Sequence, residues 1–396
     1  KQTYGEEVTE AMRLLKRAAD PHGILNPHKM FDAPPMDSHL RYGTDYAAQV
    51  WMPALDFKRN GGLQTAIEQC NGQGVCRKTT GVMCPSYQAT REEANSTRGR
   101  ANLLRAMILL NVERSTFNAQ QSDAVFQSLD LCLACKGCKS ECPSGVDMAK
   151  LKFEFMHEYY KTHRRPLRDY LFGYFHITAR VLSVFAPLVN GMMSMAWTKN
   201  LAARILQITP HRPFPRFSWK RAKVARILAP HASAGVGNPQ NTAGRHPAPR
   251  VIFLSDAFSR YIEPQVEQAA FDILAACGYQ ILVLPVVGAG AGLVSKSFFE
   301  SAQRHARSVL SAFKRLDPEG VLPVVGIEPP EVYCLKNDYA DLLPSRAEET
   351  ASLSARTWLL DEFLLRSDAF HNLRVASIGS RSSSKTTLPK IQLQPH

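Results

Sequence analysis

Four cysteines between positions 132 and 142 constrain this chain more than any other feature. They follow the spacing C-x2-C-x2-C-x3-C-P and comprise Cys132, Cys135, Cys138 and Cys142, with Pro143 directly after. Three thiols separated by two-residue gaps can bind three corners of an iron–sulfur cube, and a fourth cysteine before a proline commonly serves a second cluster. A structural zinc site or free thiols are the alternatives, but zinc usually takes two separated cysteine pairs. The run therefore predicts a [4Fe-4S] cluster.

The residues around Cys142 predict where that cysteine lies. Pro143 suits the first position of a helix, because its missing N–H would have no partner there. Cys142 would then stand at a helix N-terminus. The helix dipole, together with Lys136 and Lys139, would favour a net-anionic cluster at this point.

A second, incomplete cysteine motif precedes the first. Cys70 and Cys76 have the spacing of a first and a third ligand, Gln73 stands at the second position, and Cys84 is followed by proline. Seven cysteines cannot supply two complete four-thiolate clusters. A second cluster would therefore need a non-cysteine ligand or a three-iron form; alternatively, only one cluster exists and some thiols are structural.

The composition indicates a globular protein in a reducing compartment. The chain has 396 residues, 45% of them hydrophobic, and seven of its nine cysteines fall between positions 70 and 142, which is clustering for metal and not for disulfides. No secretion signal is recognisable. The formal net charge of +13 is spread along the chain, and its densest piece, 161–168, adjoins an apolar run. We therefore expect a solvated face or an anionic-lipid contact, and no nucleic acid.

Hydrophobic periodicity predicts helices over 6–19, 92–112 and 148–160. In the second, Leu104 would face inward, while Arg98, Arg100 and Arg105 would lie outside. Two cysteine motifs separated by such helices predict an α-helical ferredoxin domain.

Residues 181–198 carry no charge and approach the length of a membrane span. Proline, asparagine, glycine and serine interrupt them, so a helical hairpin that packs on a neighbour or lies at a membrane surface is favoured over a true span. The Ala-, Gly-, Asn- and Pro-rich stretch 231–249 reads as a linker.

The last third has an α/β pattern. We expect strands at 251–255, 281–285 and 322–327, with helices at 264–277, 296–316 and 350–365, an order typical of a parallel sheet covered by helices. The glycine-rich loop 288–292 lacks the third glycine and the acidic residue of a dinucleotide site. A plain turn is favoured there.

Taken together, several segments resemble the large FAD-linked D-2-hydroxyacid dehydrogenases, the D-lactate, D-2-hydroxyglutarate and glycolate oxidase type. They are the tail D-P-H-G-I-L-N-P-H-K-M-F, the pieces C-N-G-Q-G-V-C-R-K and M-C-P-S-Y, the piece S-T-R-G-R-A-N, and the run L-D-L-C-L-A-C-K-G-C-K-S-E-C-P-S-G-V-D-M-A-K-L-K. His28 stands in the tail where glycine is common.

The resemblance implies a multidomain chain. We expect the end of an FAD-linked oxidase C-terminal domain (1–36), a connector (37–62), an α-helical 4Fe-4S ferredoxin domain (63–165), a helical hairpin and linker (166–248), and an incomplete α/β module like the cysteine-rich CCG domain (249–396). That module is degenerate, because Val286-Val287 and Glu331 replace its cysteines, and Cys277 and Cys334 lie outside such motifs. Both ends are expected to be truncated, and the substrate site would lie upstream of Lys1, so no catalytic residue is named.

In the two-cluster arrangement that the resemblance implies, the cysteine before each proline crosses to the other cluster. Cys84 would then complete the site of Cys132, Cys135 and Cys138, and Cys142 would join Cys70 and Cys76. In a one-cluster arrangement Cys142 would close its own loop and Cys84 would be spare.

The predicted function is electron transfer from FAD, reduced by a D-2-hydroxyacid in the full-length protein, through a [4Fe-4S] cluster to a quinone, a cytochrome or an electron-transfer flavoprotein. A cytoplasmic location is expected, with peripheral contact at the inner face of the membrane as a further expectation. The alternatives are an iron–sulfur subunit of a quinone-linked or heterodisulfide-type reductase, and a DNA-processing protein with a structural cluster.

Overall fold

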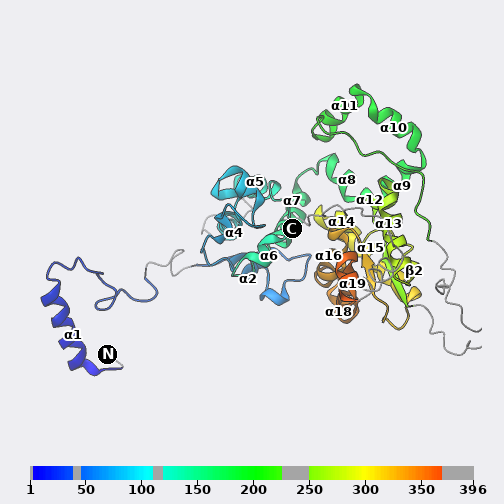
Figure 1. The fold of residues 1–396 in the computed structure, drawn as a ribbon. Helices are drawn as coiled ribbons and strands as arrows, with labels where there is room; N and C mark the ends of the chain where they lie inside the picture. Colours follow the sequence, from blue (N-terminus) through cyan, green and yellow to red (C-terminus); the bar gives the residue numbers. More distant parts are fainter. Residues whose placement is uncertain (1–2, 39–45, 110–118, 225–248, 368–396) are drawn as a thin grey trace, which may run out of the picture. The chain divides into compact units, whose positions relative to one another are not determined.

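The computed structural model describes residues 3–38, 46–109, 119–224 and 249–367 (Figure 1). Two compact units are present. The smaller comprises Lys1–Gln49 and Ile108–Thr116, and the larger comprises Val50–Met107 and Phe117–His396.

The smaller unit contains one helix, α1 (Gly5–Ala19), among its described residues. Asp20 ends it: its carboxylate accepts the N–H groups of Ile24 (2.9 Å) and Leu25 (2.8 Å) and pairs with Lys16 (2.5 Å). The apolar side chains of α1 stay exposed, and none of the fifteen residues of this helix is buried.

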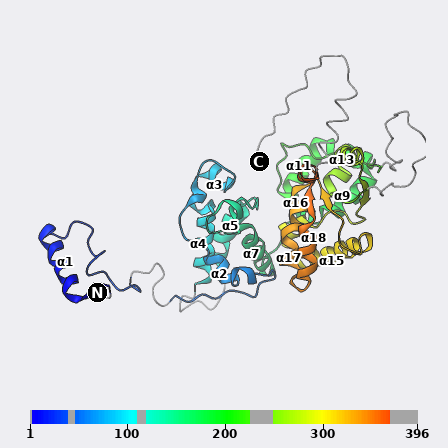
Figure 2. The same cartoon turned by 60° about the horizontal axis from the view of Figure 1, so that its bottom comes forward.

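In the larger unit, residues 63–165 form a group of helices that we call the cysteine-rich segment (Figure 1 and Figure 2). Its helices are α2 (Leu63–Glu68), α3 (Pro85–Thr90), α4 (Thr97–Ile108), α5 (Ala119–Asp130), α6 (Gly137–Glu141) and α7 (Met148–Thr162). Ile67, Leu104, Leu129 and Phe155 are fully buried and supply its core. The predicted helix at 92–112 begins later than expected, because Glu93–Asn95 forms a separate 3-10 turn and Ser96 accepts the N–H of Gly99 (2.9 Å) as an N-cap.

A buried carboxylate fixes the connector to α7. Glu154 is fully buried and accepts three hydrogen bonds, from the indole of Trp51 (3.1 Å) and from the backbone N–H groups of Ala54 (2.9 Å) and Leu55 (3.0 Å). These residues lie about 100 positions earlier in the chain, so this contact sets how the chain enters the cysteine-rich segment.

The stretch expected to be a hairpin contains four helices: α8 (Leu167–Gly173), α9 (Phe175–Val184), α10 (Ala186–Ser194) and α11 (Ala196–Leu206). Among the described residues no single helix has the length and hydropathy to cross a membrane; the one pair that passes together, α9 with α10, is bent by 101°. The predicted linker at 231–249 lies almost entirely outside the described residues.

Residues 249–367, the sheet module, contain four parallel strands in the order β2-β1-β3-β4. The strands are β1 (Arg250–Leu254), β2 (Gln280–Val283), β3 (Val324–Gly326) and β4 (Thr357–Leu359). Helices α13 (Pro264–Ala276) and α19 (Leu360–Arg366) share a core with the strands through Phe253, Phe271 and Phe363. Both faces of β1 are buried, as expected for parallel strands.

The remaining helices of the module are α12 (Ala257–Tyr261), α14 (Ala291–Ser295), α15 (Phe299–Leu316), α16 (Pro329–Tyr333), α17 (Tyr339–Leu342) and α18 (Ala347–Ala355). The single helix expected at 350–365 was wrong: β4 lies between α18 and α19 and pairs with β3. A three-residue strand is too short to leave a periodicity in the sequence. Residues 368–396, included in the expected module, lie outside the described residues.

Replacing Glu154 by leucine should destabilise the larger unit by about 2–4 kcal/mol, because three buried donors lose their acceptor. Urea unfolding monitored by circular dichroism measures this. Glu158→Leu, one turn further along α7 and only partly buried, is the matched control and should change the free energy of unfolding by less than about 0.5 kcal/mol. Equal effects of the two substitutions would contradict the assigned role of Glu154.

Candidate iron–sulfur site

Four cysteines from two separate parts of the chain line one pocket in the cysteine-rich segment. Cys132, Cys135 and Cys138 come from the loop between α5 and α6 and from α6 itself, and Cys84 comes from the start of α3. Cys84 and Cys138 are buried, whereas Cys132 is partly exposed and Cys135 is exposed. Cys142 is not among the residues that line this pocket.

The backbone around these thiols is held in unusual conformations. Cys84, Ala134 and Lys136 all have left-handed backbone, with φ of 61°, 53° and 61°. Such conformations cost non-glycine residues about 1 kcal/mol or more each and concentrate at functional sites. In the same loop the N–H of Ala134 donates to the sulfur of Cys132 (3.4 Å). The loop is therefore shaped to present sulfur atoms toward a common space.

The expected helix at Pro143 was wrong. Cys142 ends α6, Pro143 lies in a turn, and α7 begins only at Met148, where Asp147 accepts the N–H of Lys150 (3.0 Å) as an N-cap. The aspartate cap outcompetes the proline as a starting signal. It is Cys84 that precedes a helix, with Pro85 in its first turn.

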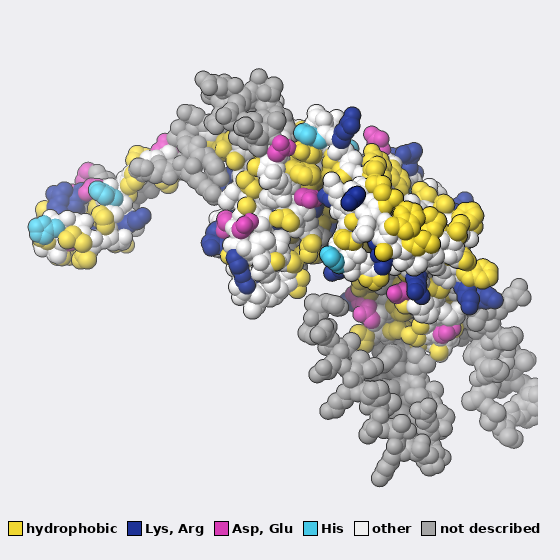
Figure 3. All heavy atoms as spheres, turned by 90° about the horizontal axis from the view of Figure 1, so that it is seen from above, with side chains coloured by type: hydrophobic (Ala, Val, Ile, Leu, Met, Phe, Trp, Pro, Cys, Tyr) yellow, Lys and Arg dark blue, Asp and Glu magenta, His cyan; other side chains and the backbone are white. Residues whose placement is uncertain are grey.

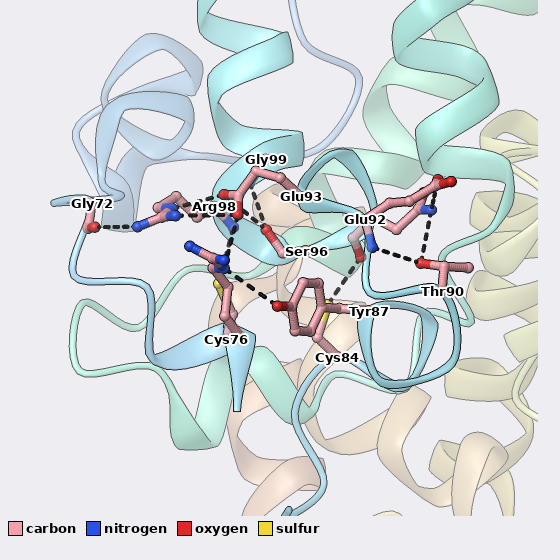
Figure 4. Close-up of polar contacts among 12 residues, drawn as sticks. Gly72, Cys76, Cys84, Tyr87, Thr90, Glu92, Glu93, Ser96, Arg98 and Gly99 are labelled. Atoms are coloured by element: carbon pink, nitrogen blue, oxygen red, sulfur yellow. Dashed lines mark hydrogen bonds and ion pairs between the residues drawn. The ribbon is translucent and has the colours of Figure 1, made fainter. Parts of the chain in front are cut away.

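The first turn of α4 touches both groups of cysteines. The backbone N–H of Arg98 donates to the sulfur of Cys76 (3.3 Å), and the hydroxyl of Thr97 donates to the sulfur of Cys84 (3.7 Å). Figure 4 shows the Arg98 side chain reaching toward Gly72 and Glu93, the latter within hydrogen-bond distance (2.8 Å). Because a helix N-terminus carries partial positive charge, this turn favours anionic groups at both positions.

Arg100 is a buried cation beside the pocket. Its side chain is 2% exposed and donates to the carbonyl of Ser128 (3.0 Å), the hydroxyl of Ser86 (2.9 Å) and the sulfur of Cys84 (3.6 Å). No carboxylate among the described residues pairs with it. A buried charge without a counter-charge is costly. An anionic iron–sulfur cluster bound by thiolates would supply that counter-charge, so the residues present fit the group.

The expected outward position of the arginines was wrong. Arg100 and Arg105 are both buried, at 2% and 8% exposure, and Arg105 donates to the carbonyl of Glu68 (2.6 Å) beside the second cysteine group. The sequence held a signal for the first of them: Arg100 is four residues before Leu104 and therefore shares its inward helical face.

The second cysteine group is less complete. Cys76 is buried in the 3-10 turn Val75–Arg77, and Cys70 and Cys142 are partly exposed. The side chain of Gln69 donates to the carbonyl of Ser144 (2.5 Å), so the turn after Cys142 is bound next to Cys70. Gln73, at the position of the missing thiol, is exposed.

A single bound metal ion fits these cysteines poorly. Among the described residues, no three His, Cys, Asp or Glu side chains converge closely enough to hold one ion. A zinc ion needs sulfur atoms about 2.3 Å from one point. The thiols instead surround a space, as a larger group requires.

The cluster loop also contacts the sheet module. Lys136 pairs with Asp338 (2.5 Å) and lies over the ring of Tyr333 at 3.9 Å, and Lys150 pairs with Asp341 (2.9 Å). Asp338 ends a π-helical stretch, Cys334–Asp338. The sheet module therefore holds the loop that carries three of the four pocket thiols.

In the sheet module a carboxylate occupies the position where cysteine was expected. Glu331 accepts the N–H groups of Ala289 (2.6 Å), Gly290 (3.0 Å) and Ala291 (3.2 Å). The glycine-rich loop is thus an anion-binding nest filled by the chain itself, and not the plain turn expected. Burial raises the pKa of Glu331 and outweighs these hydrogen bonds.

Two family models match the chain. Residues 66–146 match the 4Fe-4S dicluster domain, and residues 1–30 match the C-terminal domain of FAD linked oxidases. The iron–sulfur interpretation of the cysteine motifs is therefore confirmed, as is the flavin-oxidase resemblance of the N-terminal tail.

Curated relatives narrow the resemblance. The chain is 27% identical to the D-2-hydroxyglutarate dehydrogenase of Pseudomonas putida over 90% of its own length and 38% of the relative's. It is 34% identical to the glycolate oxidase iron-sulfur subunit of Escherichia coli over 20% of its length and 17% of the relative's, and 23% identical to a subunit of the anaerobic glycerol-3-phosphate dehydrogenase of that organism over 46% and 44%. The expected resemblance to FAD-linked D-2-hydroxyacid dehydrogenases is confirmed, although the chain spans only 38% of the dehydrogenase. No solved structure is significantly similar to the chain.

Arg100 should raise the reduction potential of the cluster beside it, because a positive charge stabilises the more negative reduced form. Arg100→Met should lower that potential by on the order of 50 mV in a redox titration monitored by EPR. Arg100→Lys, which keeps the charge, should shift it by much less. A potential that is the same in the methionine variant and the wild type would show that the charge plays no such part.

Glu328 should make stability depend on pH. Burial and the neighbouring Asp256 and Glu331 raise its pKa to about 7. The folded state therefore binds more protons than the unfolded state between the ordinary and the raised pKa, and stability falls as pH rises through that window. Glu328→Gln should gain stability relative to the wild type between about pH 5 and about pH 8, measured by urea unfolding. Parallel pH profiles of the two proteins would contradict this.

Proposed function

We propose that this chain is the electron-transfer portion of an FAD-dependent D-2-hydroxyacid dehydrogenase. The observation that carries the proposal is the pocket in which Cys84 meets Cys132, Cys135 and Cys138. This set is a four-thiolate ligand group from two segments, as in two-cluster ferredoxins. We assign Cys142 to the second group with Cys70 and Cys76. With three thiols, that group would hold a three-iron cluster or use a non-cysteine fourth ligand.

The residues around the main pocket have distinct tasks. The thiolates hold the cluster, which when bound carries single electrons from a two-electron flavin. Thr97, Arg100 and the N–H of Ala134 donate toward sulfur atoms and tune how readily the site accepts charge. Met148 and Ala149 of α7 close the pocket with buried side chains and limit water.

The N-terminal helix supports attachment to a flavin domain. Residues 1–30 match the end of such a domain, and α1 exposes Val8, Met12 and Leu15 on one stripe. An amphipathic helix normally packs that stripe against a neighbour. We infer that the neighbour is the FAD-binding part of the full-length protein, which would also hold the hydroxyacid.

D-2-hydroxyglutarate is the substrate we favour, because the relatives of that name match 90% of the chain. A separate iron–sulfur subunit is the second candidate, favoured by the similarity to two proteins named as subunits. The flavin-oxidase tail at 1–30 argues for the single-chain form. All nine cysteines are free thiols, which supports a cytoplasmic location.

Cys84→Ser in the full-length protein should separate flavin chemistry from electron transfer. Under anaerobic conditions D-2-hydroxyglutarate should bleach the flavin in both wild type and variant. The EPR signal of the reduced main cluster should appear in the wild type and be lost in the variant, because a thiolate is missing from its ligand set.

Two further variants sharpen this experiment. Cys277→Ser, outside both cysteine groups, should behave as wild type, and Cys142→Ser should leave the main signal intact while perturbing the second group. An intact main cluster in Cys84→Ser together with its loss in Cys142→Ser would overturn the crossed ligand assignment. A flavin that D-2-hydroxyglutarate does not reduce would instead count against the substrate.

A further inference from the structure

Helices α9, α10 and α11 turn their large apolar side chains outward. Each carries exposed pairs at helical spacing: Val181 and Val184 on α9 (53% and 65% exposed), Leu188 and Met192 on α10 (67% and 48%), and Trp197 and Leu201 on α11 (59% and 48%). Figure 3 shows hydrophobic side chains gathered over this part of the molecule. Stripes of this kind face a core in ordinary soluble proteins.

The inner side of these helices is built from small residues. Ala179 and Ala186 are buried against Phe217 and Tyr261, and no residue of α11 is buried. The usual arrangement, large apolar residues inside and polar residues outside, is therefore reversed here. An exposed apolar surface of this extent marks an interaction site.

The same region carries most of the net charge. Residues 175–224 contain eight Lys or Arg and no Asp or Glu, so they contribute +8 of the total +13 and leave 13 − 8 = +5 for the other 346 residues. Basic side chains surround the apolar patch in Figure 3. A surface with an apolar centre and a basic border matches the interface of a bilayer that contains anionic lipids.

Other occupants fit less well. A second copy packed on the same patch would bring two basic borders together, and like charges repel. A membrane-spanning role does not suit α9 and α10, which are bent by 101°. Trp197 and Trp219, 59% and 69% exposed, have the amphipathic side chains that favour the lipid headgroup region.

We propose that residues 175–224 form a docking surface for the anionic face of a lipid bilayer, on which α9 to α11 lie without crossing it. The apolar stripes enter the interface, and the basic residues contact lipid phosphates. This proposal does not depend on the substrate, and it would bring the electron-transfer module close to lipid-soluble acceptors.

Vesicle co-sedimentation of the full-length protein tests it. Binding is expected to phosphatidylcholine vesicles with about one third phosphatidylglycerol, to weaken strongly as salt rises from about 0.05 to about 0.5 M, and to be far weaker with pure phosphatidylcholine. The double variant Leu188→Glu/Leu201→Glu should lower the partition coefficient about tenfold or more. The control Val321→Glu/Leu365→Glu, at positions 67% and 75% exposed elsewhere, should leave it unchanged.

Visible absorbance of the cluster shows whether each variant is folded, and the salt dependence of the wild type stands even if the double variant is not. Absent binding, equal binding to neutral vesicles, or equal losses in both double variants would overturn the proposal. So would self-association that Leu188→Glu/Leu201→Glu abolishes in a protein that does not bind vesicles, because the occupant would then be a second copy.

Discussion

The structure of the cysteine-rich segment depends on bringing together thiols that are far apart in the chain. Cys84 and Cys132 are separated by 48 positions, which include α4, and they line the same pocket as Cys135 and Cys138. A cluster bound there would link the two segments as a covalent cross-link does. Metal binding and folding are then coupled, because the ligand set does not exist in the unfolded chain. The strained backbone at Cys84, Ala134 and Lys136 is stabilised by the same coupling.

Charge gives the pocket its direction. Arg100 is buried without a carboxylate partner among the described residues, and the first turn of α4 presents backbone dipole and a hydroxyl toward Cys76 and Cys84. One helix end therefore serves both cysteine groups. If each group holds a cluster, this shared turn places them side by side, which is what stepwise electron transfer requires.

The sequence could predict the chemistry better than the geometry. Cysteine spacing predicted the iron–sulfur class and the family resemblance, and periodicity located α1, α7, α13 and α15. It could not predict the burial of Arg100, since a charge is assumed to be solvated unless its partner is known. Asp147 overrode Pro143 as a helix start, and the short β4 left no periodic signal. The basic region at 175–224 was overlooked because its charges are spaced along the chain and become one surface only after folding.

The sheet module illustrates how a binding loop can become structural. Glu331 fills the nest of Ala289, Gly290 and Ala291, and Lys136 joins the module to the cluster loop through Asp338. The module thus acts as a scaffold for the pocket. Anomalous diffraction at the iron edge from anaerobically purified full-length protein tests the central assignment most directly. The account predicts iron bounded by Cys84, Cys132, Cys135 and Cys138. Iron bounded by Cys132, Cys135, Cys138 and Cys142, with Cys84 unligated, would contradict it.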